Sequence, residues 1–163
     1  MRDMPPGVRD KVYGPDYVSN GVAVHGEVAA PRTFGYAELL TRPQTTVEGY
    51  VILCGSGKVK DVPRTISGVL LRDLLDEARI RLDEHEDPNL TYVVASGKDG
   101  YRALFSWHEL FNSPAGEGVL VALTKDGAPL GDNEGRLCLV STQDERPGPR
   151  RIRYLSSVEV RRI

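Results

Sequence analysis

The chain of 163 residues has few cysteines, a single tryptophan and no long apolar run. Two cysteines are too few for a disulfide scaffold, and two cysteines with three scattered histidines do not form a zinc motif. No apolar stretch approaches the roughly 18 residues that a membrane span needs, and residues 1–7 lack the apolar core of a secretory signal. We therefore expect a soluble protein without a membrane span, periplasmic if a leader has been removed and otherwise cytoplasmic.

Net charge is also small, with a formal value of −2. Nucleic-acid binding depends on Lys and Arg that neutralise phosphates, so this balance argues against a nucleic-acid partner. The length suits one domain with a substantial core. Residues 1–20 are rich in Pro, Gly and charge without periodicity, which predicts an extended N-terminal arm followed by a single domain over residues 21–163.

Short strand patterns outnumber helical ones. Asp99-Gly100 and Asp126-Gly127 are hairpin signals, and Ser106 with Glu109 fits a capping box. A helix is predicted from about Gly68 to Arg79, because its apolar residues recur at helical spacing. The sequence thus predicts an α+β fold, with a mixed, largely antiparallel sheet or partial barrel and a few inserted helices. The expected strands cover residues 21–28, 47–54, 90–95, 101–105, 119–123, 136–141 and 158–160.

The stretch Cys54-Gly55-Ser56-Gly57-Lys58 is the main candidate site. It follows a short apolar strand, and the ends of strands are where open sheets place ligands. Nearby cationic charge and exposed backbone N–H groups favour a thiolate at Cys54. Residues 54–58 do not match the glycine-rich motifs that bind the phosphates of nucleotides. Cys138 lies in an apolar strand, which predicts an unreactive side chain that packs in the core. A disulfide bond between Cys138 and Cys54 is the alternative.

The order and spacing of several motifs resemble the sulfite oxidase-type molybdopterin-binding domain over roughly residues 21–163. The matching segments are 26–28 (Gly-Glu-Val), Cys54, 68–75 (Gly-Val-Leu-Leu-Arg-Asp-Leu-Leu), 99–101 (Asp-Gly-Tyr), 126–130 (Asp-Gly-Ala-Pro-Leu), 136–140 (Arg-Leu-Cys-Leu-Val) and 158–160 (Val-Glu-Val). Residues 1–20 lack the Arg-Asn-His-type motif that family enzymes carry near their cofactor.

This resemblance implies a small oxidoreductase that binds the molybdenum cofactor (molybdopterin) and transfers oxygen atoms or electrons. Cys54 stands where the family places its thiolate ligand to molybdenum, which is a plausible soft ligand for such a metal. Such an enzyme takes a small-molecule substrate and needs an electron-transfer partner protein. The implied cofactor-binding residues are Gly55, Ser56, Lys58, Asp99, Tyr101, Arg146, Arg150 and Arg151.

Alternatives stay open at several of these positions. The three arginines either hold the cofactor's phosphate or lie in a solvated loop that faces acids such as Asp144 and Glu145. Tyr101, with the nearby aromatic residues, is either part of a core patch or edges the ligand cleft together with Asp99. The whole chain could instead be a non-catalytic module of the same fold that binds an anionic small molecule or a partner protein. A thiol enzyme with Cys54 as nucleophile is a third reading, without an identifiable base.

Overall fold

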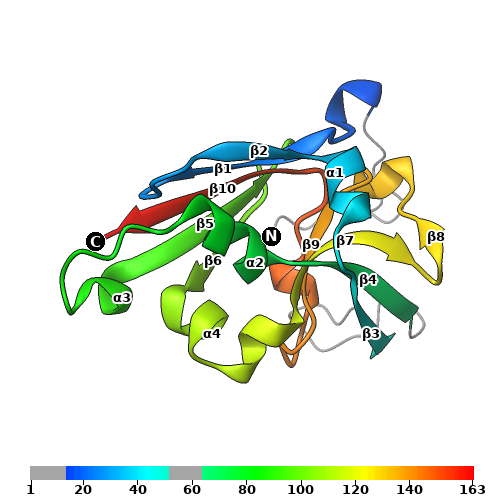
Figure 1. Cartoon of the computed structure of the whole chain (residues 1–163). Helices are drawn as coiled ribbons and strands as arrows, with labels where there is room; N and C mark the ends of the chain where they lie inside the picture. The colour runs from blue at the N-terminus through cyan, green and yellow to red at the C-terminus, as the bar shows by residue number, and fades with distance from the viewer. Residues whose placement is uncertain (1–13, 52–63) are drawn as a thin grey trace.

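A computed structural model describes residues 14–51 and 64–163 of the chain (Figure 1). Its described strands form two sheets of five strands each. The first sheet has the order β2-β1-β10-β5-β6, with β1 at Gly21–Gly26, β2 at Arg32–Gly35, β5 at Thr91–Gly97, β6 at Arg102–Ser106 and β10 at Leu155–Arg162. The second contains β3 at Thr45–Tyr50, β4 at Arg64–Leu70, β7 at Val119–Lys125, β8 at Ala128–Pro129 and β9 at Cys138–Ser141.

The helical segments are short and are inserted between strands. They are α1 at Tyr36–Thr41, α2 at Leu71–Ala78, α3 at Asp87–Leu90 and α4 at Trp107–Phe111, with single 3-10 turns η1 at Pro15–Tyr17, η2 at Pro114–Gly118, η3 at Asp132–Glu134 and η4 at Gly148–Arg150. Among the described strand pairs, β1 and β10 alone run parallel. The predicted α+β class with a largely antiparallel, mixed sheet is confirmed. Within the described ranges, no helix has the length and apolar character needed to cross a membrane.

The local turn and cap predictions are confirmed. β5 and β6 form an antiparallel hairpin around Gly100, whose φ of +85° is a conformation that favours glycine. Helix α4 begins with the capping box: the Ser106 hydroxyl accepts a hydrogen bond from the Glu109 backbone N–H at 3.0 Å, and the Glu109 carboxylate accepts one from the Ser106 N–H at 3.0 Å. The cap places the Glu109 side chain at the start of the helix, where it takes part in the site described below.

Helix α2 has the predicted buried stripe, but it begins later than the sequence suggests. Its buried residues are Leu71, Leu74, Leu75 and Ala78. Residues 68–70 do not start the helix; they end strand β4 and pair with β7. A Cβ on Gly68 would lie 2.0 Å from the Val121 carbonyl oxygen, so the glycine allows the two strands to approach closely. The helix expected from Gly68 is wrong in its first turn because strand pairing outweighs the apolar pattern.

Strand β7, in the second sheet, is buried on both faces. Alternate residues of β7 point to opposite sides, as the strand period of two requires. Val119, Val121 and Leu123 join the main core between the sheets, together with α2. Leu120 and Ala122 join a smaller cluster on the other face that includes the side chains of Tyr50, Ile66, Leu130, Cys138 and Val140. This second face carries the polar residues of most interest here.

The part of the N-terminal arm that the structure describes, residues 14–20, contacts the domain. The Ser19 N–H donates to the Gly135 carbonyl at 2.8 Å, and the Lys98 ammonium donates to the Val18 carbonyl at 2.9 Å. Tyr17 meets Tyr154 edge to face, with ring centroids 6.2 Å apart. These contacts hold residues 14–20 beside the β5–β6 hairpin and η3.

Candidate functional site

The predicted thiolate loop lies outside the described residues. Cys54, Gly55, Ser56 and Lys58 all fall within 52–63. Strand β3 leads into this segment: it ends at Tyr50, shortly before Cys54 in the sequence. The remaining predicted site residues are Asp99, Tyr101, Arg146, Arg150 and Arg151, and the structure describes all five.

Tyr101 connects the β5–β6 hairpin turn to the segment that contains Arg150 and Arg151. The Tyr101 hydroxyl donates a hydrogen bond to the Pro149 carbonyl in η4, which directly precedes Arg150. The Asp99 carboxylate accepts from the Tyr101 backbone N–H at 3.2 Å, which fixes the turn that presents the tyrosine. Burial, and then the Asp99 charge, raise the pKa of Tyr101, so its hydroxyl stays protonated and remains a donor. Two stretches predicted to share a site therefore do lie together.

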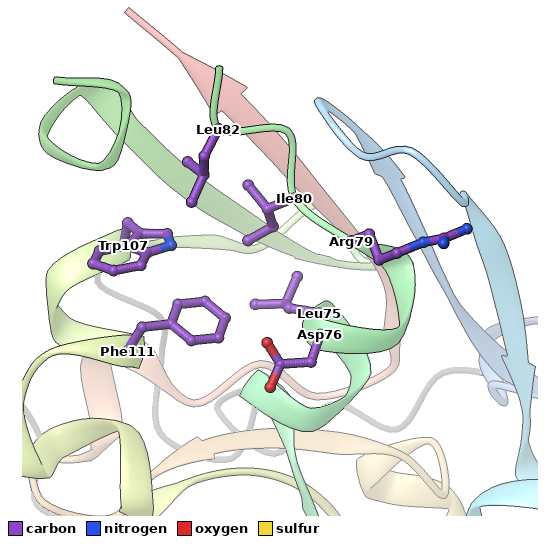
Figure 2. Close-up of a pocket in the computed structure, with 7 residues that line it drawn as sticks. All are labelled: Leu75, Asp76, Arg79, Ile80, Leu82, Trp107 and Phe111. Atoms are coloured by element: carbon purple, nitrogen blue, oxygen red, sulfur yellow. The ribbon is translucent and has the colours of Figure 1, made fainter. Parts of the chain in front are cut away.

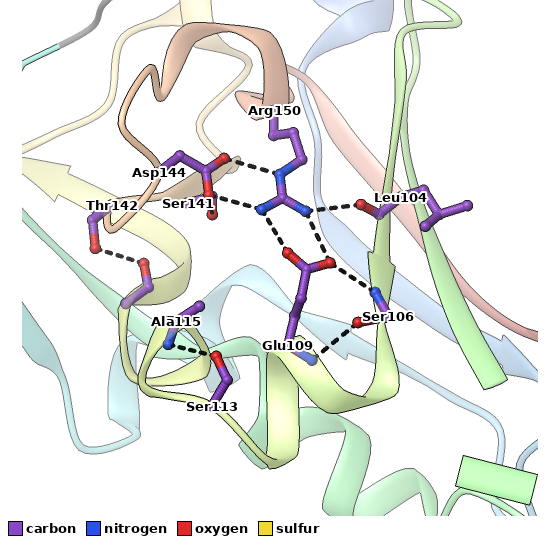
Figure 3. Close-up of polar contacts among 10 residues, drawn as sticks. Leu104, Ser106, Glu109, Ser113, Ala115, Ser141, Thr142, Asp144 and Arg150 are labelled. Atoms are coloured by element: carbon purple, nitrogen blue, oxygen red, sulfur yellow. Dashed lines mark hydrogen bonds and ion pairs between the residues drawn. The ribbon is translucent and has the colours of Figure 1, made fainter. Parts of the chain in front are cut away.

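Arg150 is held by two carboxylates and one carbonyl (Figure 3). Its Nε and Nη2 atoms donate to the Asp144 carboxylate at 2.9 and 2.7 Å. Its Nη2 and Nη1 atoms donate to the Glu109 carboxylate at 2.9 and 3.3 Å, and Nη1 also reaches the Leu104 carbonyl at 3.0 Å. The guanidinium carbon lies 4.3 Å from the centre of the Phe105 ring. Five N–H groups are all that an arginine has, and five contacts engage them here.

The pKa values of the two carboxylates record this pairing. Burial alone would raise the pKa of Asp144, but hydrogen bonds from Arg150 and from the Ser141 hydroxyl outweigh it and the pKa is lowered. Glu109 behaves in the same way: burial opposes, and the hydrogen bonds from Arg150 and the Ser106 N–H lower its pKa. Both acids are therefore ionised at neutral pH, and Arg150 joins the loop after β9 to β6 and α4.

Arg151 points to the other side of η4, into the second face of the second sheet. Its guanidinium donates to the carboxylate of Glu134, a residue only 4% exposed. Lys125 places its ammonium 3.6 Å from the same carboxylate. The Arg151 charge acts on the Cys138 thiol and on the Tyr50 hydroxyl. We call these five side chains, Tyr50, Lys125, Glu134, Cys138 and Arg151, the buried arginine cluster.

Two members of the buried arginine cluster are neutral and stay protonated. Burial raises the pKa of the Cys138 thiol to about 11, although Arg151 acts in the opposite direction. Burial likewise raises the pKa of Tyr50 far above its usual value. The Tyr50 hydroxyl is buried and has no hydrogen-bond partner among the described residues. A buried polar atom without a partner is uncommon in proteins, and this hydroxyl has a hydrogen bond left to donate.

The two consecutive arginines differ in the charge around them. Arg150 faces the two carboxylates of Asp144 and Glu109, so the summed charge of these three side chains is negative. Arg151 and Lys125 share the single carboxylate of Glu134, so the surplus there is positive. An anionic ligand is repelled at the first place and attracted at the second.

The sequence interpretation anticipated part of this arrangement. The pairing of Arg150 with Asp144 matches the alternative in which the arginine segment faces nearby acids, although the pair is half-buried rather than solvated. Arg146, in the same loop, is exposed. The sequence did not predict Tyr50, Lys125, Glu134 or Glu109 as site residues, since each is an ordinary residue in a strand, turn or cap pattern; Glu109 was predicted only as part of the capping box.

Comparison with known proteins gives the family. The chain matches the model of the oxidoreductase molybdopterin-binding domain over residues 15–161. The chain belongs to this family. No curated protein sequence matches this molybdopterin-binding domain at a significant level. Among solved structures, the domain is similar to the sulfane dehydrogenase SoxCD from Paracoccus pantotrophus, with a TM-score of 0.71 and 18% sequence identity. That match covers 91% of this chain and 40% of the dehydrogenase chain, and it shows a shared fold.

The described residues fit an anionic cofactor at the buried arginine cluster. It offers a surplus positive charge from Arg151 and Lys125, a buried hydroxyl on Tyr50 without a partner, and a position beside the strand that leads to Cys54. Elsewhere in 14–51 and 64–163, no three His, Cys, Asp or Glu side chains gather in a way that could hold a metal ion.

Proposed function

We propose that this domain is a small oxidoreductase that uses a molybdenum cofactor. The observation that carries the proposal is the family match, which spans residues 15–161 and so includes both Cys54 and the arginine segment. When bound, such a cofactor supplies oxygen-atom or electron transfer at its metal. The protein's part is to bind and orient the cofactor and to set the electrostatics around it.

Cys54 is the residue we assign as the metal ligand. A thiolate is a soft ligand suited to such a metal, and the neighbouring Lys58 favours the deprotonated sulfur. The backbone N–H groups of Gly55 and Ser56 are assigned to the cofactor as hydrogen-bond donors. The other cysteine of the chain is a poor candidate, because Cys138 is 1% exposed and burial raises its pKa to about 11.

Arg151 is the arginine best placed to bind the cofactor's phosphate. Its charge is not cancelled locally, since Lys125 shares Glu134 with it. The surroundings are buried, and a charge-assisted hydrogen bond is stronger where water is excluded. The Tyr50 hydroxyl can donate a hydrogen bond to the same ligand, because its raised pKa keeps the proton in place. Arg146, which is exposed, is proposed as a second contact at the rim.

Arg150 and Tyr101 are proposed to position this site rather than to bind the phosphate. All five N–H groups of Arg150 are engaged by Asp144, Glu109 and the Leu104 carbonyl. Tyr101 anchors the preceding turn through the Pro149 carbonyl, with Asp99 supporting the tyrosine. Together they fix the backbone from which Arg151 enters the buried arginine cluster.

The substrate of this oxidoreductase is proposed to be a small molecule, and an electron-transfer protein is proposed as its partner. The sequence contains no haem or iron–sulfur motif, so electrons released at the metal need an external acceptor.

Metal analysis tests the proposal directly. The protein, produced in a host that makes the molybdenum cofactor and is supplied with molybdate, is expected to contain close to one molybdenum per chain. Cys54→Ser should lose the metal, and Cys138→Ala is the matched control that should keep it. A well-folded wild-type sample without molybdenum, or equal metal in Cys54→Ser, would contradict the assignment.

The phosphate assignment has its own test. Arg151→Met is expected to lower the molybdenum and pterin content of the purified protein, because the surplus positive charge of the buried arginine cluster disappears. Arg161→Met is the control, since Arg161 belongs to an exposed pair with Glu159. Unchanged cofactor content in a folded Arg151→Met protein would remove Arg151 from the site. Binding of pyrophosphate without any metal in the wild-type protein would instead support the non-catalytic module.

A further inference from the structure

A cavity lies between helices α2 and α4. It has a volume of about 260 Å³ and is lined by Leu75, Asp76, Arg79, Ile80, Leu82, Trp107 and Phe111. Figure 2 shows helix α2 and the segment after it on one side and helix α4 on the other. Residues two positions apart on a helix do not face each other. Glu109 therefore serves the Arg150 contact while Trp107 and Phe111 line this cavity.

Five of the seven side chains that line the cavity are apolar or aromatic. Trp107 and Phe111 are stacked, with ring centroids 5.3 Å apart and an interplanar angle of 26°. Leu75 is fully buried, whereas Leu82 is 40% exposed at the rim. Aromatic rings attract a cation placed within about 6 Å of a ring face. The volume is just below the usual 300–1,000 Å³ of ligand pockets, which favours a small ligand.

Two polar groups point into this apolar space. In Figure 2 the Asp76 carboxylate and the indole nitrogen of Trp107 are both directed into the cavity, while the Arg79 side chain extends away from it. Neither the carboxylate nor the indole N–H has a hydrogen-bond or ion-pair partner among the described residues. Burial and the nearby Asp73 raise the pKa of Asp76, and Arg72 opposes them. Arg72 acts on the carboxylate through its charge, but no ion pair joins the two side chains in the described part of the chain.

We propose that this cavity binds a small organic cation with an apolar body, such as an aromatic amidinium or amine. The cationic group pairs with the Asp76 carboxylate, and the body packs against Leu75, Ile80 and the stacked rings of α4. Apolar pockets with a few convergent polar groups are the usual form of small-molecule sites. The charge selects the ligand, because a cation gains an ion pair with the carboxylate that a neutral molecule of the same shape cannot form. None of the residues that line this cavity belongs to the buried arginine cluster.

The single tryptophan of the chain provides the reporter. In a 1H–15N spectrum there is one indole N–H signal, and it comes from the wall of the cavity. The full-length protein is titrated with benzamidine and with benzamide, a neutral molecule of similar shape. Benzamidine is expected to shift the indole signal and to bind about five- to tenfold more tightly than benzamide, a preference set by a partly exposed ion pair and the aromatic wall.

Two variants on α2 separate the role of Asp76 from general acidity. Asp76→Asn is expected to remove the preference for benzamidine, and Asp73→Asn, which changes the same charge one turn earlier, is expected to keep it. Both residues are exposed, so folding is expected to be retained. The proposal is overturned if benzamidine does not move the indole signal, if the two compounds bind equally, or if Asp76→Asn retains the preference.

Discussion

Removing the Arg150 side chain should destabilise the protein strongly at neutral pH and only weakly in acid. In Arg150→Ala, the carboxylates of Asp144 and Glu109 lose their common partner and face each other across a half-buried space. Breaking a fully buried ion pair costs about 3–5 kcal/mol, and an exposed pair contributes about 0–1 kcal/mol. The side chains of Arg150, Asp144 and Glu109 are 24%, 18% and 37% exposed. We therefore expect a loss of about 2–3 kcal/mol in the free energy of unfolding at pH 7.

The pH dependence follows from the pKa shifts of the two acids. In the folded wild-type protein both pKa values are lowered, so Arg150 contributes stability above the ordinary carboxyl pKa values of 3.8 and 4.5. This contribution is lost as the pH falls through the depressed folded values. In Arg150→Ala the acids are free to take up protons, which relieves their burial and their repulsion. The difference between the two proteins should therefore shrink below about 1 kcal/mol near pH 3.

Urea denaturation at pH 7 and pH 3 measures this difference, since urea carries no charge that would screen the pairs. Arg150→Lys should fall between wild type and Arg150→Ala, because an ammonium cannot engage two carboxylates and a carbonyl in one plane. Arg161→Ala, which disrupts an exposed pair, should unfold close to wild type at both pH values. An equally large loss in Arg150→Ala at pH 3 and pH 7 would refute the electrostatic account and indicate lost packing on Phe105 instead.

Two further outcomes are expected. Gly68→Ala should lower the free energy of unfolding in urea by about 1–3 kcal/mol, because the added Cβ would lie 2.0 Å from the Val121 carbonyl oxygen. Gly35→Ala is the control and should stay within about 0.5 kcal/mol of wild type, because its Cβ would meet nothing within 4 Å. Equal stabilities of the two variants would contradict the close approach of β4 and β7. In the Cys54→Ser protein, Cys138 should react with iodoacetamide at least about a hundredfold more slowly in the native state than in urea, because it is buried and its pKa is raised to about 11. Mass spectrometry measures the rate of labelling. Rapid labelling of the native protein would contradict the burial of Cys138.

Local features of the fold could be predicted from sequence because neighbouring residues determine them. The β5–β6 hairpin follows from Asp99-Gly100, and the α4 cap follows from Ser106 and Glu109. The buried stripe of α2 follows from helical spacing. Strand β4, in contrast, was not predicted. Gly68 and the apolar residues after it were assigned to the next helix, and only the pairing of β4 with β7 in the folded protein shows that they end a strand.

The candidate site likewise has features that the sequence predicted and features that only the folded structure shows. The sequence by itself determined a family resemblance, a cysteine after a strand and a group of arginines near the end of the chain. It could not separate Arg150 from Arg151, which are adjacent and chemically identical. Only the tertiary structure decided that Arg150 meets Glu109, which lies 41 residues away, and that Arg151 meets Glu134. The physical reason is that charge balance depends on which side chains share a space, and folding brings those together from distant parts of the chain.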